Sequence, residues 1–198
     1  MLPLFESIRY KNGVAEHLNL HQQRVDRAIL DLGGTTAFNL ADCLNAHIKL
    51  PNNDNQIYKC KIQYNLAGNF HINFEPYLVR KINTISVHDI GDNDYVHKYS
   101  NREWINNILL KSGNDDVIFT KNGIVKDASY ANLVFFDGQN WITPSQPLLL
   151  GTRRASLIAA GIIKEALIQI KDLPKYNTVK LINAMMLWEE SPTILLHN

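Results

Sequence analysis

Three separated stretches decide how this sequence is interpreted: VHKYSNR at residues 96–102, VKDASYANL at residues 125–133 and LLGTRR at residues 149–154. The first places a lysine, Lys98, just ahead of a segment that predicts a helix. The second places an acid, Asp127, ahead of an apolar strand, and the third is a small-residue turn that opens a helix. Such a turn offers backbone N–H groups to an anion. Each stretch alone is a weak signal, so the interpretation depends on their order along the chain.

The composition is that of an ordinary globular protein. The chain has 198 residues, 45% of them hydrophobic and 20% charged, which is enough for one large domain or two small ones. A net charge of +1 with scattered basic residues argues against a nucleic-acid partner. Cys43 and Cys60 lack metal-ligand spacing, so we expect no metal and a reduced, cytoplasmic chain. We expect neither a signal peptide nor a membrane span, since no apolar stretch approaches roughly 18 residues.

The first half of the sequence predicts an α+β layer of antiparallel strands with two helices. The Asn-Gly pair at residues 12–13 favours a hairpin turn. Asn19 is a candidate N-cap for a helix that ends at the two glycines of residues 33–34. The expected strands are residues 5–11, 14–17, 57–64, 70–74 and 82–88, and the expected helices are residues 19–32 and 37–50.

The second half predicts many short strands with Gly, Asn and Asp turns, which is typical of a barrel-like β domain that carries helices. The polar run GDND at residues 91–94 indicates a boundary. We therefore expect an N-terminal α+β domain at residues 1–92 and a C-terminal barrel-like domain at residues 93–198. The expected strands are residues 117–120, 133–136, 141–143, 166–171, 180–185 and 193–196, and the expected helices are residues 101–112 and 152–160.

Three further motifs accompany the first three: LFESIR at residues 4–9, HQQR at residues 21–24 and LINAMM at residues 181–186. In this order, and over nearly the whole chain, the motifs resemble those of the class IV aminotransferases, the fold-type IV pyridoxal phosphate (PLP) enzymes. That family includes branched-chain and D-amino acid aminotransferases and aminodeoxychorismate lyase. The resemblance implies an α+β protein of two domains, a small α/β sandwich and a barrel-like PLP-binding domain.

The resemblance also assigns roles to single residues. It implies that Lys98 carries PLP and then acts as the base, and that Arg24 reaches the cofactor phosphate. It implies that Asp127 keeps the pyridine nitrogen protonated, so that the ring can accept electrons. Further predicted residues are Thr152, Arg153 (or its neighbour Arg154) and Asn183 for the cofactor, and Arg9 for a substrate carboxylate.

Several of these residues also have simpler structural explanations. Arg9 could pair with Glu6 or with a neighbouring strand, Asn183 could be a structural loop amide, and Asp127 could be a turn residue. Thr152 could be a helix N-cap. That alternative does not compete with phosphate binding, because a helix N-terminus is itself an anion site.

The chain departs from the family pattern in two ways. The family acid is usually glutamate, where this chain has Asp127, and the family's extra N-terminal strand and Gly-rich approach have no counterpart here. Three functions stay open. The motifs KYSNR and INAMM resemble those of the lyase that converts 4-amino-4-deoxychorismate to 4-aminobenzoate and pyruvate. The alternatives are a class IV aminotransferase for branched-chain or D-amino acids and a non-catalytic PLP-binding homologue.

Finally, the resemblance implies a homodimer whose active site lies between the two domains and near the partner subunit. Trp104 and Trp188 are candidates for the apolar contact between subunits, and the sequence does not choose between them. The other expected partner is a small-molecule amine substrate.

Overall fold

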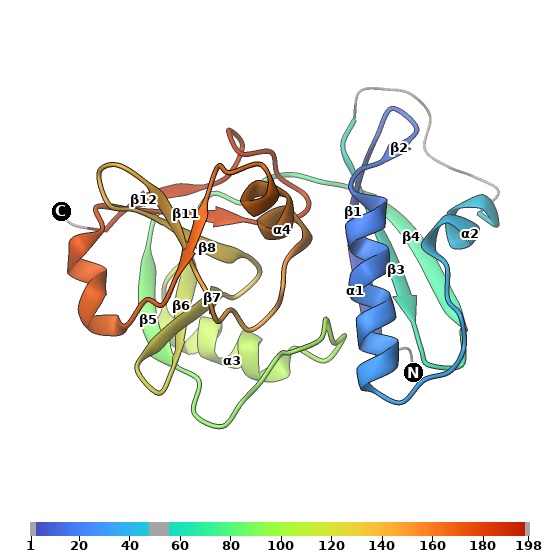
Figure 1. Ribbon diagram of the computed structural model, residues 1–198, viewed down its shortest axis with the longest axis horizontal. Coiled ribbons are helices and arrows are strands. Elements are labelled where there is room, and N and C mark those ends of the chain that lie inside the picture. The colour runs from blue at the N-terminus through green and yellow to red at the C-terminus, as the bar shows by residue number, and fades with distance from the viewer. Residues whose placement is uncertain (1–2, 48–55, 197–198) are drawn as a thin grey trace. The chain divides into compact units, whose positions relative to one another are not determined.

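The computed structural model describes residues 3–47 and 56–196, which form two compact units (Figure 1). Unit 1 comprises Met1–Leu78 and His97–Asn101, and unit 2 comprises Val79–Val96 and Arg102–Asn198. This division differs from the predicted boundary between residues 92 and 93. The strand within residues 79–96 pairs with a strand of unit 2, and residues 97–101 bond to the start of the first strand of unit 1.

Unit 1 is an antiparallel four-stranded sheet in the order β2-β1-β3-β4, accompanied by two helices, as predicted. The hairpin between β1 and β2 turns at Asn12 and Gly13, whose φ angles of 51° and 80° explain why this Asn-Gly pair suits the turn. The elements are β1 (Leu4–Lys11), β2 (Val14–Ala15), α1 (Leu18–Asp31), α2 (Leu40–Asn45), β3 (Tyr58–Tyr64) and β4 (Phe70–Pro76).

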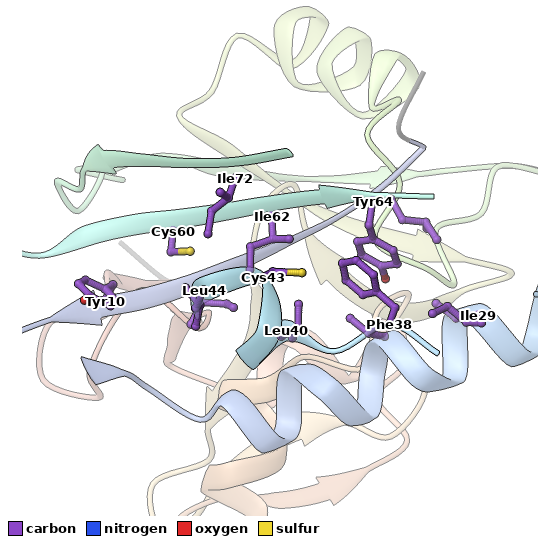
Figure 2. Packing of buried hydrophobic residues seen from close by; sticks show 14 residues of the cluster. Tyr10, Ile29, Phe38, Leu40, Cys43, Leu44, Cys60, Ile62, Tyr64 and Ile72 are labelled. Atoms are coloured by element: carbon purple, nitrogen blue, oxygen red, sulfur yellow. The ribbon is translucent and has the colours of Figure 1, made fainter. Parts of the chain in front are cut away.

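The core of unit 1 lies on one face of this sheet. Successive residues of a strand point to opposite faces, and Leu4, Ile8 and Tyr10 of β1 all point into this core. Figure 2 shows the cluster, in which the rings of Phe38 and Tyr64 stack with their centroids 4.9 Å apart. The cysteines that the sequence places at positions 43 and 60 both belong to this core.

The two helices of unit 1 begin at residues that differ from those predicted. The N-cap of α1 is His17, with φ 51°, rather than the predicted Asn19, which lies inside the helix. The second helix begins later than predicted because the Asn39 side chain caps it by accepting from the backbone N–H groups of Ala41 and Asp42. The predicted end of that helix, residues 48–50, lies outside the described residues.

Unit 2 is built on one eight-stranded sheet with the path β10-β9-β8-β7-β6-β5, from which β11 branches by pairing with β8 and with β12. Its core includes Leu133, Phe135 and Leu181. Within the described part of the chain, no helix has the length and apolar character to cross a membrane. The elements are β5 (Ile85–Asp89), α3 (Glu103–Ser112), β6 (Asp116–Lys121), β7 (Ile124–Ala128), β8 (Asn132–Phe136), β9 (Trp141–Pro144), α4 (Thr152–Ala159), β10 (Lys164–Ala166), the 3-10 helix η1 (Ile170–Lys175), β11 (Thr178–Ile182) and β12 (Thr193–Leu195).

Several elements of unit 2 differ from prediction, among them β11, which spans Thr178–Ile182 rather than residues 180–185. Strand β5 was expected in the antiparallel first half, but it pairs in parallel with β6. Strand β7 was not expected, and it places Asp127 within a strand rather than in a turn. No single strand covers residues 166–171, because β10 ends at Ala166 and η1 begins at Ile170, where Gln169 and Asp172 form a capping box.

Candidate functional site

Lys98 lies beside the first strand of unit 1. The backbone N–H of Phe5 donates to the carbonyl oxygen of Lys98 at 3.0 Å, and an antiparallel bridge pairs Leu4 with Tyr99. Because opposed residues of an antiparallel pair point to the same face, Lys98 lies on the face of Phe5, away from the Leu4 core. Its Nζ lies 4.7 Å from the centroid of the Phe5 ring. Backbone pairing therefore holds Lys98 on the Phe5 face of the sheet, which is the face opposite the Leu4 core.

Lys61 and Arg9 also lie on this face of the sheet. Nζ of Lys61, on β3, lies 5.2 Å from the centroid of the same Phe5 ring, and the register places Lys61 opposite Ser7. Arg9, on β1, is buried, and its Nε donates to Oε1 of Glu16 at 3.0 Å. The predicted substrate residue thus has a structural partner. Lys61, which the sequence analysis did not single out, shares its aromatic contact with the predicted catalytic lysine.

A fully buried carboxylate, Glu6, joins β1 to α1. It accepts from Nε of Arg24 at 2.9 Å and from Nη2 of Arg24, and it lies 2.6 Å from Nδ1 of His21. Burial raises the pKa of Glu6, but the Arg24 charge and the hydrogen bonds with His21 and Arg24 outweigh it and lower this pKa to about 2. The i, i+3 spacing puts His21 and Arg24 on one helix face, as predicted.

In unit 2, Asp127 and Asn132 face each other across the β7–β8 hairpin. Nδ2 of Asn132 donates to Oδ1 of Asp127 at 2.8 Å and to the Leu149 carbonyl at 2.9 Å. The backbone N–H of Leu149 donates to Oδ2 of Asp127 at 2.9 Å. Burial raises the pKa of Asp127 to about 6, although these hydrogen bonds oppose the shift. Asp127 and Asn132 therefore form a clamp on the backbone of Leu149.

Leu149, whose backbone the clamp holds, lies just ahead of the N-terminus of α4. Gly151 is the N-cap of this helix, so Thr152 does not have the alternative role of N-cap and is instead the first residue of the helix, where it is buried. A Cβ atom on Gly151 would lie 1.9 Å from Oδ1 of Asn132, so only glycine fits beside the clamp. Because glycine has no side chain to accept from the first N–H groups of the helix, the turn suits an anion such as a phosphate.

The two arginines that follow have different surroundings. Nη2 of Arg154 donates to the carbonyl of Pro144 at 2.9 Å and to Oε1 of Glu165 at 2.5 Å, which ties α4 to the end of β9 and to the middle of β10. Arg153 is also buried. Arg154 therefore has a structural role, and Arg153 stays the predicted cofactor residue of the two.

Asn183 follows β11. Its Oδ1 accepts from the backbone N–H of Met185 at 2.8 Å, which shapes the turn after the strand. Asn183 therefore has the structural role of a loop amide, which was one of the two roles considered for it. Cofactor binding by Asn183 stays a prediction.

The predicted cofactor residues thus belong to both units. Unit 1 holds the lysine and an arginine fixed by a buried acid, and unit 2 holds a buried acid and an uncapped glycine-led helix N-terminus. This donor chemistry fits PLP, which needs an amine, an acid and phosphate donors. Together with the α+β architecture, it agrees with the fold-type IV class of PLP enzymes.

The chain belongs to the amino-transferase class IV family, whose model matches residues 3–189. It is 37% identical over 187 residues to an uncharacterized protein of Haemophilus influenzae, covering 93% of this chain and 98% of that protein. A solved structure from Haemophilus somnus, provisionally named 4-amino-4-deoxychorismate lyase, is 33% identical with a TM-score of 0.87, covering 93% of this chain and 97% of the other. A provisionally named amino-acid aminotransferase of Mesorhizobium loti, 19% identical, shares the fold with a TM-score of 0.77 and coverage of 97% and 98%.

Proposed function

We propose that this chain is a PLP-dependent lyase that converts 4-amino-4-deoxychorismate to 4-aminobenzoate and pyruvate. The observation that carries the proposal is the 33% identity, over nearly the full length of both chains, to the Haemophilus somnus protein that bears this provisional name. The motifs around Lys98 and after β11 support the same choice, since they resemble the lyase more than the branched-chain aminotransferases.

The residues predicted from the sequence would hold the cofactor. Lys98 would be the attachment residue, Arg24 and the N-terminus of α4 would bind the phosphate, and Asp127 would keep the pyridine nitrogen protonated. With a pKa raised by burial to about 6, Asp127 is mostly ionised at neutral pH and can keep a pyridinium proton in place. When bound, PLP supplies an electron sink for the charge that develops on the amine-bearing carbon.

The amine of Lys98 would then move the proton. Its Nζ takes the proton from the ring carbon that bears the substrate amine, the C–O bond to the enolpyruvyl group breaks, and the ring becomes aromatic. The enolpyruvyl group leaves with the electron pair of the C–O bond and takes up a proton to become pyruvate, the ring is released as 4-aminobenzoate, and no keto-acid acceptor is consumed. The substrate carboxylates need cations, and Arg9 and Lys61, which lie on the Phe5 face of the sheet, would supply them.

A matched pair of assays tests this proposal. The PLP-loaded protein receives 4-amino-4-deoxychorismate without any acceptor, and pyruvate release is followed. In parallel, a panel of L- and D-amino acids is supplied with 2-oxoglutarate. Sustained pyruvate release without acceptor supports the lyase. Acceptor-dependent turnover of amino acids, with no pyruvate from 4-amino-4-deoxychorismate, would replace it with the class IV aminotransferase alternative. Binding of PLP without turnover in either assay would instead indicate a non-catalytic homologue.

A homodimer is part of the same proposal. Trp104 and Trp188, the residues suggested for the contact, each have an aromatic neighbour within unit 2, Phe119 at 5.3 Å and Trp141 at 5.1 Å between ring centroids. Substitution of either tryptophan is therefore a poor test of the dimer. Sedimentation at micromolar concentration is a direct one, and a fully active monomer would contradict it.

A further inference from the structure

The side chains of Glu6, His21 and Arg24 form one buried network in unit 1, with exposed fractions of 0%, 0% and 8%. Two N–H groups of the Arg24 guanidinium, on Nε and Nη2, donate to the two carboxylate oxygens of Glu6. Such a two-point contact fixes the plane of the guanidinium as well as its position. It also lets a cation remain buried, because its charge is balanced by a carboxylate whose pKa is held at about 2.

His21 completes the network. A carboxylate can only accept hydrogen bonds, so at 2.6 Å from Oε2 of Glu6 the Nδ1 atom of His21 carries the proton and donates. Oε2 therefore receives both His21 and one N–H group of Arg24. Burial is the main cause that lowers the pKa of His21, so a neutral ring with this fixed tautomer suits the site. Glu6 is thus held from a second direction while it holds Arg24.

We propose that Glu6 and His21 are positioning residues that fix the Arg24 guanidinium in the orientation in which it binds the phosphate of PLP. The inference rests on the proposed function only in that PLP is the cofactor and Arg24 binds its phosphate. A guanidinium already held in one plane loses little side-chain freedom when the phosphate arrives, so the network increases affinity by preorganisation. In a merely structural role, the network would stabilise the packing of α1 on β1 equally with or without a phosphate.

Paired titrations of the full chain with PLP and with pyridoxal, which lacks the phosphate, separate these roles. Absorbance gives the dissociation constant of each. Glu6→Gln should weaken PLP binding roughly tenfold, about the contribution of one charge-assisted hydrogen bond, and leave pyridoxal binding unchanged. In an Arg24→Ala background, Glu6→Gln should cause no further loss, because the residue that it positions is gone.

The matched control is Glu16→Gln, which makes the same change in the Arg9–Glu16 pair of the same unit and should leave the ratio of the two constants unchanged. If Glu6→Gln fails to fold, as circular dichroism would show, His21→Gln decides, with an expected severalfold loss for PLP only. Equal losses for PLP and pyridoxal, no loss for either, or additive losses with Arg24→Ala would overturn the proposal. None of these readouts uses turnover, so a failed lyase assay leaves the test intact.

Discussion

Each unit contains one buried acid at the candidate site, Asp127 as a predicted residue and Glu6 as the partner of predicted Arg24, and the pKa values of the two acids are shifted in opposite directions. Glu6 in unit 1 and Asp127 in unit 2 are exposed by only 0% and 5%. Burial raises both pKa values, yet the pKa of Glu6 ends at about 2 and that of Asp127 at about 6. Glu6 has a cation, Arg24, as a direct partner, whereas the direct hydrogen-bond donors to Asp127 are neutral. Similar burial therefore produces opposite shifts, according to the charge of the partner.

The largest expected effect is on stability, and it sharpens this comparison. Glu6→Ala leaves Arg24 buried without its counter-charge, which should cost about 3 to 5 kcal/mol of unfolding free energy. Asp127→Ala leaves only neutral donors unsatisfied and should cost about 1 to 3 kcal/mol. Urea denaturation of the two variants measures both values. Equal losses would mean that the partner charge does not distinguish the two acids.

The contributions of Glu6 and Asp127 to the free energy of unfolding should change with pH in opposite directions. The pKa of Glu6 is lowered from 4.5 to about 2, so its contribution is present above pH 4.5 and is lost as the pH falls toward 2. The pKa of Asp127 is raised from 3.8 to about 6, so its ionisation is a penalty that is absent below pH 3.8 and grows as the pH rises through 6. Each contribution amounts to roughly 3 kcal/mol.

The measurement compares the wild type with Glu6→Gln and with Asp127→Asn across this range. From pH 2 to 4.5 the wild type should gain stability relative to Glu6→Gln. From pH 4 to 6 it should lose stability relative to Asp127→Asn. Parallel pH profiles for the two differences would refute the assignment of opposite shifts.

A smaller effect tests the clamp that Asp127 and Asn132 form on the backbone of Leu149. Gly151→Ala would bring a Cβ within 1.9 Å of Oδ1 of Asn132, so we expect a loss of about 1 to 3 kcal/mol. In an Asn132→Ala background the same substitution should cost almost nothing, because the opposing oxygen is absent. Thermal or urea denaturation of the four proteins completes this double-mutant cycle. Equal costs in both backgrounds would contradict a close contact between Gly151 and Asn132.

Local patterns in the sequence predict much of the fold. The Asn-Gly hairpin, the helix face shared by His21 and Arg24, and the helix that opens at residue 152 all depend on neighbours within a few residues. The boundary between units does not. Strand β5 joins β6, about thirty residues later, and the stretch around Lys98 bonds to the start of β1. Such pairings connect distant residues, and periodicity in a single sequence carries no information about them.

The candidate site shows the same limit. The sequence motifs indicate Lys98, Arg24 and Asp127, but not the residues that hold them. One signal was available for Glu6, because its alternation with Leu4 and Ile8 places an acid on a buried strand face, where a partner is required. No comparable signal exists for the bond between Asn132 and the Leu149 backbone, which depends on how a later loop folds back.

The central claim is that this chain attaches PLP at Lys98, and peptide mapping after borohydride reduction tests it most directly. Reduction of the PLP-loaded protein should leave the mass of the reduced cofactor on the peptide that contains Lys98. In Lys98→Ala the label should disappear, and turnover should fall at least about a thousandfold, within the range for loss of a proton-transfer group. Label on Lys111, Lys121 or Lys126, or undiminished labelling of Lys98→Ala, would contradict the account.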